Sequence, residues 1–192
     1  MPRIEKIVVA THNAGKLKEI LALLAPLGIT VVSAGDLGLE DDAIENGATF
    51  EENAFIKAKH TADKTNLPTL ADDSGLCVDA LNGRPGLYTA RYGGYEKLLQ
   101  EMATVPEGAR QAHFCTTLAF VQPNTTDVVY FEAKSYGTIR LSPLGDGGFG
   151  YDPVFTPNGY NKTYAELLQD EKNSISCRGK ALTDFKEWLA AL

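Results

Sequence analysis

The chain has 192 residues, of which 44% are hydrophobic, and this is enough for one domain or for two lobes that share a core. Its formal net charge of −7 argues against a protein that coats nucleic acid, because phosphate backbones are held mainly by clustered Lys and Arg. An acidic protein that handles phosphates instead needs a divalent metal ion and a few well-placed lysines.

The cysteines and the apolar runs exclude several further classes of protein. Cys77, Cys115 and Cys177 are widely spaced and include no CxxC pair, so neither a disulfide framework nor a zinc site is indicated. No apolar run approaches the roughly 20 residues that span a bilayer, and the N-terminus lacks the apolar core of a signal peptide. We therefore expect a soluble, cytoplasmic protein in a reducing setting, with no membrane partner.

The first segment predicts a strand, a polar turn and a helix. Ile7 to Ala10 is a continuous apolar run, which is typical of a strand buried on both faces. After the turn, with Asn13 as a plausible N-cap, apolar residues recur at helical spacing at Leu17, Ile20, Leu21 and Leu24. This arrangement aims backbone N–H groups at one spot and suits an anion, to which Lys16 adds a positive charge. A plain capped turn with a solvent-exposed lysine explains the segment equally well.

The next segments predict a second strand, an acidic loop and a second helix. The strand is Ile29 to Ser33, and the loop that follows runs to Glu45. The helix opens at a Thr-x-x-Glu capping box, Thr49 to Glu52, and continues to about Lys64. Lys57 on this helix is a candidate second phosphate lysine, although a solvated lysine is the commoner case.

Two adjacent carboxylates follow a short apolar run in the middle of the chain. Thr69 to Ala71 predicts a short strand that delivers Asp72 and Asp73 into the turn Ser74-Gly75. Neighbouring side chains of a strand point to opposite faces, so only one of the two carboxylates can enter a given cleft. Asp73 is favoured, because it lies at the predicted strand's end beside a glycine. Ordinary Asp-Ser-Gly turn chemistry is the alternative.

The second half of the chain begins with a short amphipathic helix around residues 95–102 and then predicts a long antiparallel hairpin. Its strands are Ala112 to Val121 and Val128 to Arg140. His113 and Cys115 alternate onto one face of the first strand. With no partner motif in the sequence, we interpret both as structural residues.

A glycine-rich segment, Gly145 to Gly150, fits the pattern G-x-G-x-x-G. A dinucleotide fingerprint must follow a strand and open a helix, and Pro153 close behind this segment prevents a helix there. We interpret it as a glycine loop that presents Phe149 and Asp152 to a ligand, with Phe149 stacking on a base. The alternative is that Phe149 fills the core.

The C-terminal segment predicts two helices. The first opens at a capping box, Thr163 to Glu166, and extends to about Lys172, and the second carries apolar residues from Ala181 to Leu189. Lys172 and Arg178 flank the junction between them. Either could be a helix-end charge without a further role.

Taken together, these segments resemble the inosine/xanthosine triphosphate pyrophosphatase family. The matching motifs occur in the family's order over almost the whole chain, at residues 10–16 (ATHNAGK), 49–54 (TFEENA), 71–76 (ADDSGL), 85–92 (PGLYTARY), 148–153 (GFGYDP) and 176–179 (SCRG). Each motif alone is weak, whereas their joint occurrence is specific.

The resemblance implies an α/β fold of two lobes around a long central mixed β-sheet flanked by helices, with the active-site cleft between the lobes. It implies that residues 1–192 form a single nucleotide pyrophosphatase domain and that the protein is a homodimer. The implied reaction is Mg²⁺-dependent hydrolysis of ITP, dITP or XTP to the monophosphate and pyrophosphate, which cleanses the nucleotide pool.

The resemblance also implies roles for individual residues. Glu45 and Asp73 would bind Mg²⁺, and Asp73 would also accept the proton of the attacking water. Cationic side chains such as Lys172 and Arg178 would donate hydrogen bonds to the 6-oxo group of hypoxanthine or xanthine. With adenine, which has an amino group there, these donors would be left unpaired. The implied substrate-binding residues are Thr11, His12, Asn13, Ala14, Gly15, Lys16, Lys57, Ser74, Phe149, Gly150, Tyr151, Asp152, Lys172, Cys177 and Arg178.

Two positions depart from the family's pattern. Position 12 is His where bacterial relatives commonly have Gly, and position 177 is Cys where the family generally has His. A thiol is a poorer hydrogen-bond donor than an imidazole, so Cys177 is expected to alter the selectivity among purines or the rate of hydrolysis relative to other family members. Two alternatives to the implied activity therefore stay open: a pyrophosphatase of the same architecture with another base preference, and a catalytically idle nucleotide-binding module.

Overall fold

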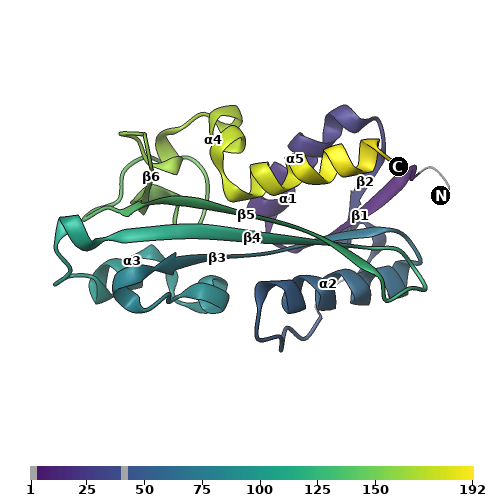
Figure 1. Ribbon diagram of the computed structural model, residues 1–192, viewed down its shortest axis with the longest axis horizontal. Helices are drawn as coiled ribbons and strands as arrows, with labels where there is room; N and C mark the ends of the chain where they lie inside the picture. The colour runs from purple at the N-terminus through teal and green to yellow at the C-terminus, as the bar shows by residue number, and fades with distance from the viewer. Residues whose placement is uncertain (1–3, 40–42) are drawn as a thin grey trace. The chain divides into compact units, whose positions relative to one another are not determined.

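The computed structural model describes residues 4–39 and 43–192, in which a six-stranded β-sheet is flanked by helices (Figure 1). The strand order is β2-β1-β3-β4-β5-β6. β1 pairs in parallel with β2 and β3, whereas β5 and β6 are antiparallel, so the sheet is mixed. The strands are β1 (Lys6–Ala10), β2 (Thr30–Ser33), β3 (Thr69–Val78), β4 (Gln111–Val121), β5 (Val128–Ile139) and β6 (Phe155–Pro157), and the helices are α1 (Ala14–Leu24), α2 (Phe50–Thr65), α3 (Gly94–Glu101), α4 (Gln169–Ile175) and α5 (Cys177–Ala190). The α/β class implied by the resemblance is confirmed.

The chain divides into two compact units. Unit 1 comprises Met1–Asp73, Thr116–Glu132 and Arg178–Leu192, and unit 2 comprises Ser74–Cys115 and Ala133–Cys177. The long strands β3, β4 and β5 contribute residues to both units. Each unit has its own hydrophobic core, and each is described by itself below.

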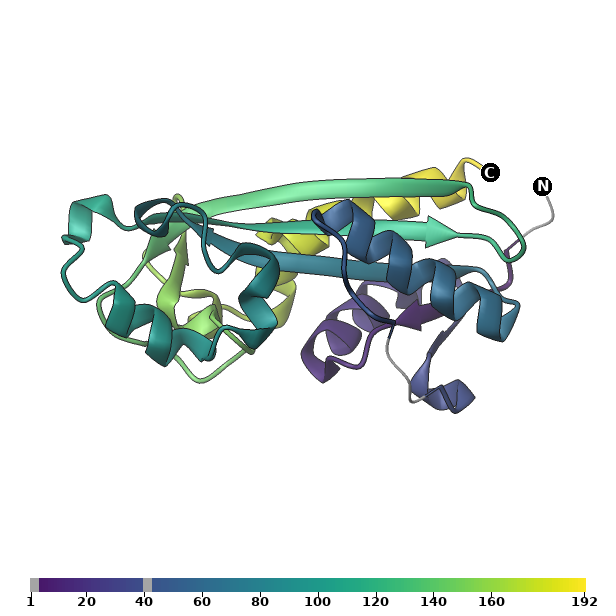
Figure 2. The same cartoon turned by 90° about the horizontal axis from the view of Figure 1, so that it is seen from below.

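In unit 1, helices cover both faces of the sheet: α2 lies on one face, and α1 and α5 lie on the other (Figures 1 and 2). Side chains alternate along β4, so Ala119 faces α2 while Phe120 faces α5. The α2 face is lined by small residues, which lets helix and sheet approach closely, and its buried members are Ala54, Ala58, Ala62, Ala71 and Ala119. On the other face, the Phe120 ring packs 5.6 Å from that of Phe185 and 5.3 Å from that of Trp188.

The core of unit 2 combines aliphatic and aromatic side chains. It buries residues from β3, α3 and β5 together with the segment around β6, among them Leu76, Leu98 and Phe155. Arg110 is buried beside this core, and its guanidinium donates to the carbonyl oxygens of residues 102, 105, 139 and 140 at 2.8–3.0 Å. Because these carbonyls satisfy the buried cation, the end of α3 is tied to the end of β5.

Most elements predicted from the sequence are present with boundaries shifted by one or two residues. β1 and α1 follow each other as predicted, and the Asn13 side chain caps α1 by accepting from the Lys16 backbone N–H at 3.0 Å. β4 and β5 are neighbours in the sheet and are joined by a short turn, as the predicted hairpin requires. Residues 40–42 of the predicted acidic loop lie outside the described residues.

Two predictions about element ends are wrong. The strand that was expected to end at Asp73 continues to Val78 as the ten-residue β3, because Leu76 and Val78 are buried in the core of unit 2. The helix expected from Thr163 to Lys172 is interrupted: the capping box forms, but it starts only a 3₁₀ turn, and α4 begins at Gln169. Leu167 and Leu168 between them are extended.

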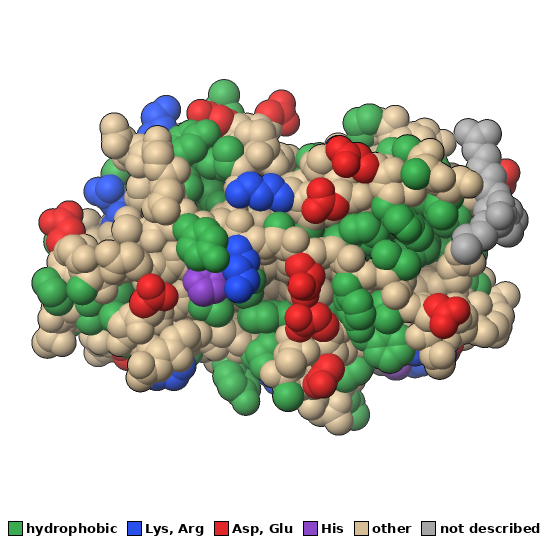
Figure 3. Space-filling model, viewed as in Figure 1, with side chains coloured by type: hydrophobic (Ala, Val, Ile, Leu, Met, Phe, Trp, Pro, Cys, Tyr) green, Lys and Arg blue, Asp and Glu red, His purple; other side chains and the backbone are tan. Residues whose placement is uncertain are grey.

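The surface carries charges of both signs. Figure 3 shows acidic and basic side chains interspersed with hydrophobic ones on the face in view, in keeping with the net charge of −7. No helix in the described ranges combines the length and the apolar character that crossing a membrane requires.

Candidate active site

The turn between β1 and α1 presents polar groups at the start of a helix. Thr11 Oγ1 accepts from the backbone N–H of Asn13 at 3.2 Å, and Asn13 caps the helix. Ala14 and Gly15 form the first turn of α1 and are followed by Lys16. The N-terminus of an α-helix carries a partial positive charge and unpaired N–H groups. This turn therefore suits a phosphate oxygen, with Lys16 beside it.

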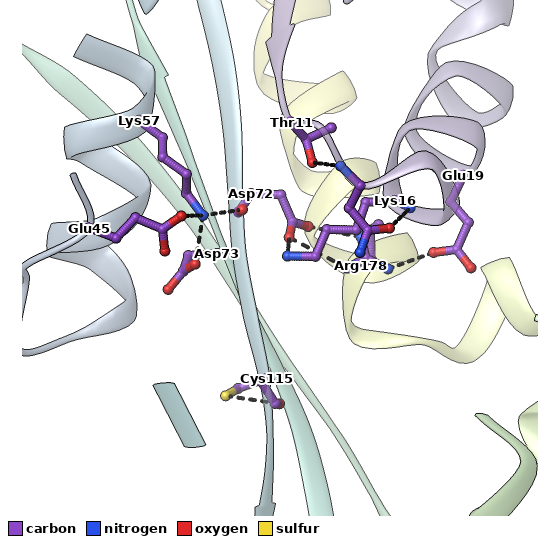
Figure 4. A network of polar contacts seen from close by, with 11 residues as sticks. Thr11, Lys16, Glu19, Glu45, Lys57, Asp72, Asp73, Cys115 and Arg178 are labelled. Carbon is purple, nitrogen blue, oxygen red and sulfur yellow. Dashed lines mark hydrogen bonds and ion pairs between the residues drawn. The ribbon is translucent and has the colours of Figure 1, made fainter. Parts of the chain in front are cut away.

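Asp72 is the centre of a buried network in unit 1 that joins β3, α1 and α5 (Figure 4). Its Oδ1 lies 2.7 Å from Lys16 Nζ, and its Oδ2 accepts from Arg178 Nε at 2.8 Å. The Arg178 guanidinium also donates to Glu19 Oε2 at 2.6 Å. Burial alone would raise the pKa of Asp72, but the charges of Arg178 and Lys16 outweigh it and hold the pKa well below its ordinary value. Asp72 is therefore an anion that fixes two cations.

Asp73 lies on the opposite side of β3, as the alternation of side chains along a strand requires (Figure 4). Its Oδ1 accepts from Lys57 Nζ at 2.6 Å, and the same ammonium donates to the backbone carbonyl of Asp72 at 2.9 Å. Glu45 Oε1 lies 3.6 Å from Lys57 Nζ. Burial raises the pKa of Asp73 above its ordinary value, and Lys57 offsets part of this rise. A carboxylate with a raised pKa is a stronger proton acceptor once it is ionised.

The carboxylates of Glu45 and Asp73 fit a hard divalent cation. Both contact the Lys57 ammonium, so their oxygens converge on one positive charge, and Mg²⁺ prefers oxygen ligands of this kind. Within residues 4–39 and 43–192, no three His, Cys, Asp or Glu side chains are grouped as a metal site. Mg²⁺ commonly binds one or two carboxylates and completes its shell with waters and substrate phosphates. Two carboxylates therefore suffice for an ion that arrives with a triphosphate.

In unit 2, three of the residues expected to contact the base lie together. Lys172 Nζ contacts Asp152 Oδ2 at 2.6 Å and lies 4.8 Å from the centre of the Phe149 ring. Asp152 Oδ2 also accepts from the backbone N–H of Phe149 at 2.8 Å. Gly148 has φ +68°, and a Cβ there would collide with the Asp152 carboxylate. The glycine loop therefore folds back over Asp152 and holds Phe149 half-buried beside a cation.

The remaining residues of the expected site differ in how deeply they are buried. Tyr151 is part of the core of unit 2, and its hydroxyl donates to the carbonyl of Thr89 at 2.9 Å. Ser74 is half-buried within β3, whereas Cys177 is buried at the start of α5. His12 and Gly150 are exposed, the latter with φ +60°.

Arg178 was expected beside the base, together with Lys172, and the two residues belong to different units. Arg178 is in unit 1, where it is bonded to Asp72 and Glu19, and Lys172 is in unit 2. The role of Arg178 in contacting a base stays a prediction. The network adds a residue that the sequence did not indicate, Glu19, which is only 3% exposed. Glu19 falls outside the predicted apolar stripe of α1 and is indistinguishable in the sequence from a solvated helix carboxylate.

Unit 1 thus combines a capped helix start, two lysines and a pair of converging carboxylates in an α/β fold, an arrangement that suits a phosphate group and a divalent metal ion. The model of the Ham1 family matches residues 7–188, and the chain belongs to this family. This confirms the family membership that the six motifs indicate.

Relatives with curated names are similar over nearly their full length. A dITP/XTP pyrophosphatase of Shigella flexneri is 46% identical over 189 residues, which cover 93% of this chain and 95% of the relative. A dITP/XTP pyrophosphatase of Halalkalibacterium halodurans is 45% identical over 190 residues, which cover 95% and 97%.

Solved structures share the fold. A HAM1 protein from Coxiella burnetii superposes with a TM-score of 0.88 at 37% identity, covering 98% of this chain and 100% of that protein. A nucleoside-triphosphatase, or dITP/XTP pyrophosphatase, from Mycobacterium abscessus gives a TM-score of 0.73 at 40% identity, covering 94% and 98%. The mixed sheet flanked by helices is therefore the fold of this family.

Proposed function

We propose that the protein is a Mg²⁺-dependent pyrophosphatase that hydrolyses ITP, dITP and XTP to the monophosphate and pyrophosphate and so cleanses the nucleotide pool. The observation that carries the proposal is the convergence of Glu45 and Asp73 on the Lys57 ammonium. The names of the relatives from Shigella flexneri and Halalkalibacterium halodurans support the same activity.

In this proposal the phosphate chemistry belongs to residues of unit 1. Glu45 and Asp73 would hold Mg²⁺, which would activate the attacking water and screen the negative charge of the triphosphate. Asp73 accepts the proton of the attacking water at a carboxylate oxygen, and Lys57 holds that carboxylate in position. Lys16 and the first N–H groups of α1 bind phosphate oxygens. Asp72 fixes the Lys16 ammonium for this purpose.

Unit 2 supplies three of the residues proposed to choose the base, Phe149, Asp152 and Lys172, and the base contact of Arg178 in unit 1 stays a prediction. Phe149 offers a ring on which a purine stacks, and Lys172 offers N–H donors to a 6-oxo group. Asp152 holds the Lys172 ammonium at 2.6 Å and thereby limits the directions in which it can donate. Adenine carries an amino group at the same position and leaves the donor unpaired, which a hydrogen-bonding site rejects strongly.

The test of this function is kcat/KM for pyrophosphate release from ITP, XTP, GTP and ATP, with Mg²⁺ and with EDTA. We expect ITP and XTP to exceed ATP by about 100-fold or more and activity to vanish in EDTA. A higher rate for another base would favour a same-architecture enzyme with that base preference. Binding of all four nucleotides without pyrophosphate release would favour an idle nucleotide-binding module.

Lys16→Ala is expected to weaken binding of a non-hydrolysable ITP analogue by about 10- to 100-fold, because it removes one charge-assisted contact to phosphate. Titration calorimetry measures the change. Lys18→Ala is the matched control, since Lys18 lies on the same helix and is exposed. Equal affinity of the Lys16 and Lys18 variants would remove Lys16 from the phosphate site.

We also propose that the protein is a cytoplasmic homodimer, as its family resemblance implies. Light scattering coupled to size-exclusion chromatography measures the mass in solution. The 20.7 kDa mass of the single chain would contradict the dimer.

A further inference from the structure

The three cysteines of the chain all belong to unit 2, and none of the three forms a disulfide in the described structure. Cys77 lies on β3 and Cys115 lies on β4, which are neighbours in the sheet. The Cys115 thiol is hydrogen-bonded to Cys77. Its Sγ also lies 3.5 Å from the carbonyl oxygen of Gly75, two residues before Cys77 on β3. The two thiols therefore face each other across adjacent strands.

The two thiols differ in exposure. Cys77 is partly exposed, whereas Cys115 is only 8% exposed. A small oxidant from solvent thus reaches Cys77 first and finds Cys115 directly behind it. Cys177 is buried as well, so it does not compete for the first encounter.

The charges around Cys77 favour its thiolate. The hydrogen bond from Cys115 is the largest influence, and with the nearby Lys134 it outweighs burial and Asp79, lowering the pKa of Cys77 to about 7. The same hydrogen bond, together with burial, raises the pKa of Cys115 above its ordinary value. His113 is also close to Lys134 and Asp79, and burial lowers its pKa, so it adds little positive charge near neutrality. Thiolates rather than thiols react with peroxides.

We propose that Cys77 and Cys115 form a peroxide-reactive dithiol that closes to an intrachain disulfide across β3 and β4. The Cys77 thiolate attacks one oxygen of hydrogen peroxide, forming an S–O bond and breaking the O–O bond, and hydroxide leaves. The Cys115 sulfur then attacks the Cys77 sulfenic acid, forming the S–S bond as the S–O bond breaks, and water leaves with the proton of Cys115. The thiols lose two electrons and the peroxide gains them.

The sheet geometry accommodates this bond. Neighbouring strands lie about 4.8 Å apart, and a disulfide spans Cα separations of roughly 4.4–6.8 Å. The two thiols already lie within hydrogen-bond reach of each other, so the bond would join side chains that are in contact. Cys77 and Cys115 have no part in the proposed nucleotide chemistry, so the dithiol stands or fails independently of it.

The test is to treat the full chain with hydrogen peroxide, without nucleotide or metal, and to count free thiols in denaturant. We expect the count to fall from three to one and to return to three after reduction with dithiothreitol. Peptide mapping without reductant should find the Cys77 peptide joined to the Cys115 peptide. An unchanged count, a bond to Cys177 or a bond between two chains would each overturn the proposal.

Three single-cysteine substitutions show which cysteine reacts with peroxide and which one closes the disulfide. Cys177→Ser should retain the loss of two thiols, whereas Cys77→Ser should keep both of its thiols at peroxide doses that fully oxidise the parent. Cys115→Ser should accumulate a sulfenic acid on Cys77, which dimedone traps and mass spectrometry locates. Loss of thiols in Cys77→Ser at the parent's rate would overturn the assignment, and this comparison does not depend on whether the buried Cys115 tolerates serine.

Discussion

Asp73→Asn is expected to lower kcat for Mg²⁺-dependent hydrolysis of ITP by about 10²–10⁴-fold, the usual contribution of a general base. An amide cannot accept the water's proton and is a weaker ligand for Mg²⁺ than a carboxylate. Burial also raises the pKa of Asp73, and its Oδ1 is held at 2.6 Å by Lys57. Both features suit a group that takes up a proton during the reaction.

The measurement is steady-state pyrophosphate release, with circular dichroism to check that the variant is folded. Asp127→Asn is the matched control, because it makes the same chemical change in unit 1 at an exposed position of the turn between β4 and β5. Activity of the Asp73 variant equal to that of the Asp127 variant would remove Asp73 from the mechanism.

Much of the local structure could be predicted, because its causes lie within a few residues. The Asn13 cap of α1 is a contact over three residues of sequence, and it forms as predicted. The capping box at Thr163 also forms, since Glu166 reaches back to the Thr163 backbone N–H. At the start of α2 the box is one-sided: Thr49 accepts from the Glu52 N–H, while the Glu52 side chain accepts from Ala48 instead.

What could not be predicted depends on partners that are distant in the sequence. Arg178 meets Asp72 across 106 positions and Glu19 across 159 positions, and nothing in the helical pattern of α1 distinguishes Glu19 from a surface residue. The continuation of β3 past Asp73 has the same cause. Polar residues in the middle of a strand indicate a turn when they are read locally. Here cations from α1, α2 and α5 pair with the two buried aspartates and offset the cost of burying their charge.

The two adjacent aspartates consequently have different roles: Asp73 serves the proposed chemistry, and Asp72 stabilises the fold. Asp73 is bonded to one lysine and is 7% exposed, whereas Asp72 is 1% exposed and bonded to both Lys16 and Arg178. A substitution at Asp73 chiefly affects the proposed chemistry. A substitution at Asp72 leaves two cations without their shared partner and chiefly affects stability.

Asp72→Asn is expected to lower the free energy of unfolding by about 3–5 kcal/mol, because removing one partner of a buried ion network leaves uncompensated charge in the interior. Urea denaturation at pH 7 measures the change. Asp63→Asn is the matched control: Asp63 pairs with Lys59 on the surface of α2, and an exposed pair of this kind is worth about 1 kcal/mol or less. Similar midpoints for the two variants would show that the network does not stabilise the fold.

The pH dependence of this effect has a definite sign. The pKa of Asp72 is depressed in the folded state, so its contribution is fully present above the unfolded pKa, about 3.9, and is lost as pH falls towards the folded value. The difference in unfolding free energy between the parent and Asp72→Asn should therefore be constant from about pH 6 to pH 8 and shrink below about pH 4. A difference that grew on acidification would mean that Asp72 is not held as an anion between Lys16 and Arg178.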